Sequence, residues 1–362
     1  MKKILYDEQM FTFQRFGGVT RYFADLIYNL PAEEFVADIP MIFCENHYVT
    51  ETYGNEYKRF SFPANYRLRR RIYSLFNRSA SKNAVKHSDY DIFHPTYYNP
   101  YFLKSVKERG KQFVLTIHDM TFERYPQNVL FYDNTIRNKK RLITEADHII
   151  AVSENTKRDI VEILGTDPSK ISVVHHGYRP VTTVAPKLFD HYVLYVGERK
   201  GYKNFLPWLS AISPLLHLDR NLKIVCTGAP FTGSELKQFA GWGVSDRMIH
   251  ISANDAQIAS LYRHALCFVF PSHYEGFGIP ILEAFHNNCP VCLSNASCFP
   301  EVAGNAAIYF NPGDAHSMHD TLKEILASKP LRKELQQKGA QRCKEFSLER
   351  MVEETCNIYR KM

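Results

Sequence analysis

The chain has 362 residues, of which 45% are hydrophobic and 23% are charged, and its formal net charge is +7. This length exceeds the roughly 100 to 200 residues of one ordinary domain, so we expect two domains, and the lack of long biased tracts excludes extended disorder. No apolar run approaches the roughly 20 residues that span a bilayer, and no signal-peptide core is present, so we expect a cytoplasmic protein.

Short β-rich runs alternate with helical patterns along the chain, which predicts βαβ units and parallel sheets. The expected strands of the first half are KKILYD, FVADIPMIF, DIFHPT, FVLTIHD, HIIAVS and ISVVHHG, and those of the second half are YVLYVGE, LKIVCTG, MIHIS, LCFVFPS, PVCLS and AAIYF. Residues 179–187 between the halves contain two prolines and little periodicity, which is typical of a linker. We therefore expect two doubly wound α/β domains, 1–184 and 185–345, with ligands at the carboxyl ends of their strands.

A basic segment runs from Tyr57 to Ser88 and contains no acidic residue. Its basic residues are Lys58, Arg59, Arg67, Arg69, Arg70, Arg71, Arg78, Lys82 and Lys86. Apolar residues are interleaved with them, as expected of a segment that lies on an anionic membrane surface. A solvated helix face in a basic protein explains the same pattern, whereas nucleic-acid binding is disfavoured because no nucleic-acid motif accompanies the charge.

The most informative stretch runs from Phe268 to Phe285 and predicts a buried strand, a glycine loop and a helix. Pro280 suits the first turn of that helix, and the glycines let the backbone approach a ligand. The helix N-terminus favours a phosphate, so a nucleoside diphosphate would fit there. Two carboxylates frame the turn: Glu275 in the loop and Glu283, which we place in the first turn of the helix, where the helix dipole alone would also favour a glutamate.

This stretch resembles the E-x7-E motif of the GT4 family of retaining GT-B glycosyltransferases. The resemblance continues through Pro290-Val291, Ser294, 300–304 and Asn311-Pro312, and it extends over nearly the whole chain. In the first half it includes Gly17-Gly18 before a helix, 116–119 at a strand end and 151–153 before another helix. The ordered set is far more specific than any one of its motifs.

The resemblance implies a GT-B fold, a nucleotide-sugar donor and a glycan or lipid-linked acceptor. Glu283 would hold the donor ribose, Glu275 would contact the transferred sugar or organise its transfer, and His118 would lie near that sugar. The remaining donor-side residues would be Gly17, Gly18, Arg199, Lys203, Gly276, Phe277 and Gly278. The family's arginine often directly follows a glycine that corresponds to Gly197, where this chain has Glu198, so Arg199 takes or shares that role.

Two further residues are assigned to the acceptor side with an alternative beside each. His94, at the end of an expected strand, either helps to form the acceptor site or packs in the core. Asp119 either belongs to the site or caps the next turn. The last segment, 346–362, resembles the family's terminal helix that crosses back to the N-terminal domain.

No metal or other cofactor is expected. Lys203, Arg199 and the helix N-terminus can stabilise the charge that develops on a nucleoside diphosphate leaving group, and the resembled family is metal-independent. Cys289 and Cys292 have a CxxC spacing, but no second pair accompanies them, so we interpret them as core residues. The leading hypothesis is a retaining hexosyl- or mannosyltransferase of polysaccharide biosynthesis, such as lipopolysaccharide synthesis, located in the cytoplasm or peripherally on the membrane. A sugar-nucleotide epimerase of the same architecture and a non-catalytic nucleotide-binding scaffold remain as alternatives.

Overall fold

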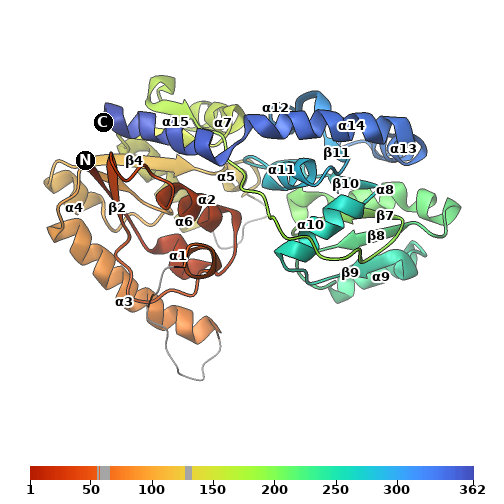
Figure 1. Ribbon diagram of the computed structural model, residues 1–362, viewed down its shortest axis with the longest axis horizontal. Helices are drawn as coiled ribbons and strands as arrows, with labels where there is room; N and C mark the ends of the chain where they lie inside the picture. Colours follow the sequence, from red (N-terminus) through yellow and green to blue (C-terminus); the bar gives the residue numbers. More distant parts are fainter. Residues whose placement is uncertain (55–56, 58–65, 127–132) are drawn as a thin grey trace. The chain divides into compact units, whose positions relative to one another are not determined.

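The computed structural model describes residues 1–54, 57, 66–126 and 133–362 and divides the chain into two compact units (Figure 1). Unit 1 comprises Met1–Gly177 together with Leu348–Met362, and unit 2 comprises Tyr178–Ser347. The expected linker, 179–187, contains no helix or strand. It belongs to unit 2, because the Ala185 N–H donates to the Ala256 carbonyl and the Ser260 hydroxyl donates to the Pro186 carbonyl.

Unit 1 is built on six parallel strands in the order β2-β1-β3-β4-β5-β6. The strands are β1 (Lys2–Tyr6), β2 (Phe35–Asp38), β3 (Ile92–His94), β4 (Gln112–Ile117), β5 (His148–Ala151) and β6 (Ile171–Val173). The helices are α1 (Gln9–Phe13), α2 (Gly18–Ile27), α3 (Tyr66–His87), α4 (Leu103–Glu108), α5 (Thr121–Arg124), α6 (Asp133–Glu145), α7 (Glu154–Leu164) and α15 (Leu348–Lys361).

Unit 2 is built on a second parallel sheet of six strands, in the order β12-β11-β10-β7-β8-β9. The strands are β7 (Tyr192–Tyr195), β8 (Lys223–Cys226), β9 (Met248–His250), β10 (Cys267–Phe270), β11 (Val291–Ser294) and β12 (Ala307–Phe310). The helices are α8 (Phe205–Leu218), α9 (Gly233–Gly241), α10 (Asp255–His264), α11 (Ile279–His286), α12 (Phe299–Ala303), α13 (Ala315–Ala327) and α14 (Lys329–Arg342).

Each of the twelve expected runs contains a strand, and the predicted α/β class with two doubly wound sheets is confirmed. The run FVADIPMIF was predicted too long, because β2 ends at Asp38, two residues before Pro40, whose nitrogen cannot donate to a strand ladder. Helix caps follow the sequence signals. Ser153 accepts a hydrogen bond from the Thr156 N–H at the start of α7, and Gly165 ends that helix in the left-handed region.

The core of unit 1 includes the last helix of the chain. Met351, Val352, Cys356 and Tyr359 of α15 are buried in one cluster with residues of β1 and α2. The Lys2 ammonium group of β1 also donates to the carbonyls of Tyr359 and Arg360. Both marked ends of the chain therefore lie in unit 1 (Figure 1). Among the described helices, none combines the length and the apolar character that crossing a bilayer requires.

Candidate functional site

In unit 2 the strand order reverses between β7 and β10, the first and fourth strands of that sheet in chain order. Open parallel sheets bind ligands just beyond the carboxyl ends of the strands at such a switch point. The loop after β7 carries Arg199 and Lys203, and the loop after β10 carries Glu275. The topology alone therefore brings together residues that are more than 70 positions apart in the sequence.

The Glu275 carboxylate forms an ion pair with Lys203. The Lys203 Nζ atom lies 2.6 Å from Glu275 Oε1, and both side chains are largely buried, at 18% and 15% exposed. The Ser272 hydroxyl donates to the same carboxylate oxygen at 2.8 Å. A carboxylate and an ammonium group thus meet at the switch point, as the predicted site requires.

The backbone of Glu275 is held by the turn before α12. The Glu275 N–H donates to Ser297 Oγ at 3.2 Å, and the Ser297 hydroxyl donates to the Glu275 carbonyl at 2.6 Å. The Cys298 thiol also donates to that carbonyl, at 3.3 Å. Ser297 has a φ of +54°, in the left-handed region that residues other than glycine rarely adopt. The turn that holds the Glu275 loop therefore has a constrained backbone.

The predicted sequence of strand, glycine loop and helix is confirmed around Glu275. β10 is buried along its length, and Pro280 lies in the first turn of α11. Gly278 has a φ of +94°, which strongly favours glycine, and a Cβ atom there would also lie close to Ile281 Cδ1, at 3.1 Å. The Phe277 side chain is buried against Phe346, which leaves its backbone as the part that can face a ligand.

Glu283 does not lie in the first turn of α11, as we expected from the sequence. The helix begins at Ile279, so Glu283 is its fifth residue, and no acidic residue lies in the first turn. The expected position was wrong because the helix begins at Ile279, directly after Gly278, which is earlier than the loop composition suggested. The Tyr262 hydroxyl of α10 donates to Glu283 Oε2 at 3.1 Å and fixes the carboxylate from the neighbouring helix.

Arg199 is more deeply engaged than the sequence suggested. It is 6% exposed, its Nε atom donates to Glu235 Oε1 at 2.7 Å, and its Nη2 atom donates to the carbonyls of Ala229 and Pro230. Burial alone would raise the pKa of Glu235, but the hydrogen bonds from Arg199 and Thr232 and the Arg199 charge together outweigh it and lower that pKa. Arg199 therefore ties the loop after β7 to the loop after β8, and only its Nη1 atom lacks a hydrogen bond within the described part of the chain.

In unit 1, His118 follows β4 and is 8% exposed. Neither of its ring nitrogens has a hydrogen-bond partner among the described residues, although the rings of Tyr22, Phe23 and His176 surround it. Burial lowers the pKa of His118 to about 3, so the imidazole is neutral near pH 7. A neutral imidazole offers one donor and one acceptor, which suits a sugar hydroxyl.

His94 lies in the core of unit 1. It is fully buried, its Nδ1 atom lies 2.6 Å from the Tyr359 hydroxyl, and its Nε2 atom lies 2.8 Å from Thr116 Oγ1. Burial lowers its pKa to about 3. Of the two roles that we weighed for His94, this geometry favours packing, because both nitrogens already have partners and no surface of the ring is accessible.

Asp119 caps the turn that follows β4, because its Oδ1 atom accepts a hydrogen bond from the Thr121 N–H at 2.9 Å. Its carbonyl accepts a hydrogen bond from the buried Lys139 ammonium group, which also pairs with Glu123. Gly17 precedes α2 as expected, and a Cβ atom there would overlap the Gln14 side chain. Gly18 is the first residue of α2. The roles that we predict for these residues stay predictions.

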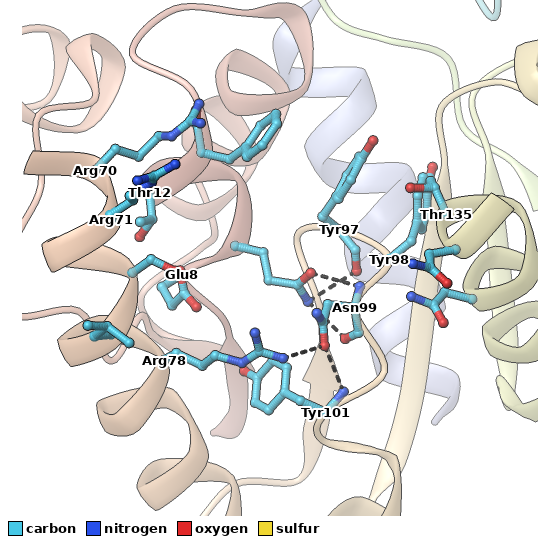
Figure 2. Close-up of a pocket in the computed structure, with 16 residues that line it drawn as sticks. Glu8, Thr12, Arg70, Arg71, Arg78, Tyr97, Tyr98, Asn99, Tyr101 and Thr135 are labelled. Atoms are coloured by element: carbon cyan, nitrogen blue, oxygen red, sulfur yellow. Dashed lines mark hydrogen bonds between the residues drawn. The ribbon is translucent and has the colours of Figure 1, made fainter. Parts of the chain in front are cut away.

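A pocket of about 610 Å³ lies at the carboxyl ends of β1 and β3, where the strand order of unit 1 reverses (Figure 2). Its lining residues are Glu8, Gln9, Thr12, Phe13, Arg70, Arg71, Ser74, Leu75, Arg78, Tyr97, Tyr98, Asn99, Tyr101, Asn134, Thr135 and Asn138. We did not predict this pocket from the sequence. The signal that points to it is the pair of carboxylates, Asp7 and Glu8, directly after the first strand.

The basic segment that we singled out forms one wall of this pocket. Its residues 58–65 lie outside the described residues, and most of the rest forms α3. Tyr73 and Asn77 face the interior, whereas Leu75 and Phe76 are 74% and 49% exposed. Arg69 pairs with Glu45, so the three consecutive arginines at 69–71 do not share one environment.

Comparison with known proteins gives matches over both units. Residues 185–342 match the family described as glycosyl transferases group 1, and residues 16–180 match glycosyltransferase family 4. O-antigen chain mannosyltransferase RfbU of Salmonella typhimurium is 30% identical over 58% of this chain, and the match spans 60% of its own length, less than two thirds. O-antigen chain mannosyltransferase B of Escherichia coli is 26% identical over 76% of this chain and 75% of its own.

Solved structures agree on the fold. The structure of HepE from Anabaena in complex with UDP-glucose superposes with a TM-score of 0.76 at 15% identity, covering both chains completely. Sucrose-phosphate synthase from Thermosynechococcus elongatus has a TM-score of 0.75 at 16% identity, over 100% of this chain and 99% of its own. With two parallel sheets, a charged pair at the switch point of unit 2 and family matches over both units, the chain belongs to the GT4 family of GT-B glycosyltransferases.

Proposed function

We propose that this protein transfers a hexose, most specifically mannose, from a nucleotide-diphosphate sugar to a glycan or lipid-linked acceptor of a surface polysaccharide, with retention of anomeric configuration. The observation that carries the proposal is the Lys203–Glu275 pair at the β7–β10 switch point, beside a glycine loop that leads into a helix N-terminus. The mannosyl and O-antigen parts of the proposal rest on the names of the relatives, RfbU and mannosyltransferase B.

The geometry suggests a division of labour at the donor. Negative charge grows on the nucleoside diphosphate as the glycosidic bond breaks, and the Lys203 ammonium group and the N-terminus of α11 supply a positive field there. An ammonium group has three protons, so it can hold a carboxylate and a phosphate oxygen together. Glu275 supports the positive character that develops at the anomeric carbon, and Glu283 holds the ribose.

We further propose that no divalent metal ion takes part, because these cationic groups occupy the role that a metal ion has in other transferases. Arg199 adds to this positive field from its buried position in the loop after β7, where its hydrogen bond to Glu235 holds it in place. His118, neutral and without a partner for its ring nitrogens in the described part of the chain, hydrogen-bonds a hydroxyl of the transferred sugar.

A donor screen tests the function. GDP-mannose, GDP, UDP-glucose, UDP-galactose and UDP are added separately, and the melting temperature of the full chain is measured, because a ligand of the native state stabilises it by mass action. The best donor is then incubated with candidate glycan acceptors, with and without EDTA, and the product anomer is determined by NMR. We expect stabilisation by GDP-mannose, transfer that survives EDTA, and a product with the anomeric configuration of the donor.

Each arm has an outcome that contradicts one part of the proposal. Inversion at the anomeric carbon would overturn the retaining mechanism, and complete loss in EDTA that Mg²⁺ or Mn²⁺ restores would overturn metal independence. A changed sugar on an intact nucleotide would identify an epimerase. Binding without transfer or hydrolysis, over a broad set of acceptors, would identify a scaffold.

We also propose that α3 docks the enzyme on an anionic membrane surface, where a lipid-linked acceptor would be found. Leu75 and Phe76 are exposed apolar residues, and Lys82 and Lys86 are exposed on the same helix. Co-sedimentation with phosphatidylglycerol vesicles is expected at low salt and should weaken at high salt. A variant that carries Leu75→Ser, Phe76→Ser, Lys82→Gln and Lys86→Gln together should lose vesicle binding. Binding that persists in this variant would reject α3 as the docking element.

A further inference from the structure

The pocket between α1, α3 and the loop after β3 has a basic wall. The donor chemistry proposed above assigns no role to it. Arg70, Arg71 and Arg78 line it from α3. Arg78 follows the adjacent pair by seven to eight residues, about two helical turns, so all three lie along one side of the helix. Figure 2 shows these arginines on one side of the pocket and Tyr97, Tyr98 and Thr135 on the other. All of its lining residues belong to unit 1.

The three arginines are not neutralised by carboxylates. None of them forms an ion pair with any carboxylate in the part of the chain that the structure describes. Arg70 stacks on the Phe13 ring and makes a 3.4 Å contact with the Phe13 carbonyl, and Arg78 donates to Asn99 Oδ1 at 2.8 Å. Each guanidinium group carries five N–H donors, so these contacts leave most of the donors for a ligand.

The floor of the pocket is fixed by a hydrogen-bond chain that begins at Asp7. The Gln9 side chain donates to the Asp7 carboxylate at 2.7 Å and accepts from the Asn99 N–H at 2.8 Å. Asn99 in turn holds Arg78. The guanidinium group is therefore positioned before any ligand arrives, which lowers the entropic cost of binding.

The only carboxylate among the described lining residues is Glu8. Burial first, and the neighbouring Asp7 charge second, raise the pKa of Glu8 to about 7. Glu8 is therefore only partly ionised near pH 7, and although the Arg78 charge lowers its pKa somewhat, Glu8 offsets at most one of the three positive charges of α3. The opposite wall offers the amide and hydroxyl groups of Asn134, Thr135 and Asn138, which suit sugar hydroxyls.

We propose that this pocket binds a phosphate group carried by the sugar acceptor, with Arg71 and Arg78 as its principal ligands and Arg70 beside them. Guanidinium groups bind phosphate oxygens in pairs, and the pocket volume of about 610 Å³ admits a sugar as well as its phosphate. That the bound phosphate belongs to the sugar acceptor depends on the function proposed above, whereas the phosphate site itself does not. The phosphate can belong to a soluble sugar phosphate or to a lipid-linked sugar.

Hydrogen exchange of the full chain, followed by mass spectrometry, tests the site without requiring turnover. The probes are mannose 1-phosphate, octyl phosphate and mannose. We expect mannose 1-phosphate to slow exchange in peptides that cover 68–78 and 97–101, and mannose to have no effect there. Protection by octyl phosphate as well would assign the site to lipid-linked phosphates, and protection by mannose 1-phosphate alone would assign it to sugar phosphates. Peptides of 271–283 report separately any binding at the donor site of unit 2.

Arg71→Gln with Arg78→Gln should weaken this protection roughly 10-fold or more, and Arg71→Lys with Arg78→Lys should retain part of it. Lys104→Gln with Lys170→Gln removes two exposed charges of unit 1 outside α3 and the pocket, and it should leave this protection unchanged. Equal protection by mannose, or full protection in the arginine-to-glutamine variant, would overturn the proposal. A chain that binds mannose 1-phosphate here but transfers no sugar would refute the proposed function and leave this site intact.

Discussion

Both units are built on a parallel sheet, but the polar groups near their strand ends differ in whether they have partners within the chain. In unit 2 the polar groups at the strand ends are partners of each other, because Lys203 and Ser272 both donate to the Glu275 carboxylate. In unit 1 the ring nitrogens of the buried His118 have no hydrogen-bond partner, as far as the structure describes the chain. Buried polar groups normally have partners. The contrast suggests that unit 2 carries a preorganised catalytic pair, whereas the polar groups of unit 1 are completed by the ligand.

The largest effect should come from removing the charge of Glu275. Glu275→Gln keeps the size and part of the hydrogen bonding but removes the negative charge, so we expect turnover to fall about 10³-fold with little change in donor affinity. Initial rates and donor titrations measure the two quantities separately. Glu334→Gln, in an exposed pair with Lys338, is the matched control and should behave as the parent. A parental rate for the Glu275 variant would refute the catalytic pair.

The two histidines of unit 1 should separate activity from stability. His118→Ala should lower kcat/KM roughly 100-fold and destabilise the protein less than His94→Ala does, because it loses ring contacts with Tyr22, Phe23 and His176 but no hydrogen bond. His94→Ala should lower the free energy of unfolding by roughly 2–4 kcal/mol, because it leaves the hydroxyls of Tyr359 and Thr116 without this partner and opens a cavity. Denaturant unfolding and steady-state kinetics of both variants test this. The reverse pattern would contradict our division of roles.

A smaller effect is expected at Glu283. Glu283→Ala should raise the donor KM roughly 10-fold with little change in kcat, because a ribose contact is made equally in the ground state and the transition state. Tyr262→Phe removes the hydroxyl that holds this carboxylate and should give a weaker change in the same direction. A loss of kcat in either variant, with KM unchanged, would show that Glu283 acts in the transition state instead.

The most gradual effect is a dependence of unit 1 stability on pH. The pKa values of His94 and His118 are about 3 in the folded state, below the unfolded value of 6.5, so their contribution is complete above pH 6.5 and is lost as the pH falls toward 3. The pKa of Glu8 is raised from 4.5 to about 7, so Glu8 opposes this trend between those values. Burial also lowers the pKa of His176 and His148 and raises that of Asp7 and Asp38, so the histidines of unit 1 with a lowered pKa outnumber the carboxyl groups with a raised one. Stability should fall by about 1.4 kcal/mol per pH unit for each excess proton.

Hydrogen exchange in peptides of β1, β3 and β4 measures this dependence. Trp208 and Trp242 both lie in unit 2, so tryptophan fluorescence provides an internal comparison with the other unit. Glu8→Gln should make the acid dependence of unit 1 steeper, and His94→Gln should make it shallower. A stability of unit 1 that rises as the pH falls from 6.5 to 5 would show that the carboxyl groups outweigh the histidines.

The sequence predicted the strands and the Glu275 loop because the signals there are local. An apolar run, glycines and a proline within twenty residues specify β10, its loop and α11. The pairing of Arg199 with Glu235, 36 residues away, could not be predicted, because it depends on the approach of two strand-end loops. The same holds for His94, whose partner Tyr359 lies 265 residues away. The basic stretch was visible, but which of its arginines face a pocket depends on the packing of α3.

The placement of α15 has a consequence for synthesis on the ribosome. The chain leaves unit 1 at Gly177 and returns to it at Leu348, after the whole of unit 2. At about 5–20 residues per second, translation of unit 2 takes on the order of ten seconds or more, during which the surface of unit 1 that α15 later covers stays exposed. Unit 2 can complete its fold in that interval, whereas unit 1 must wait for Tyr359. A nascent chain stalled before Leu348 is therefore expected to recruit hydrophobic-binding chaperones through unit 1.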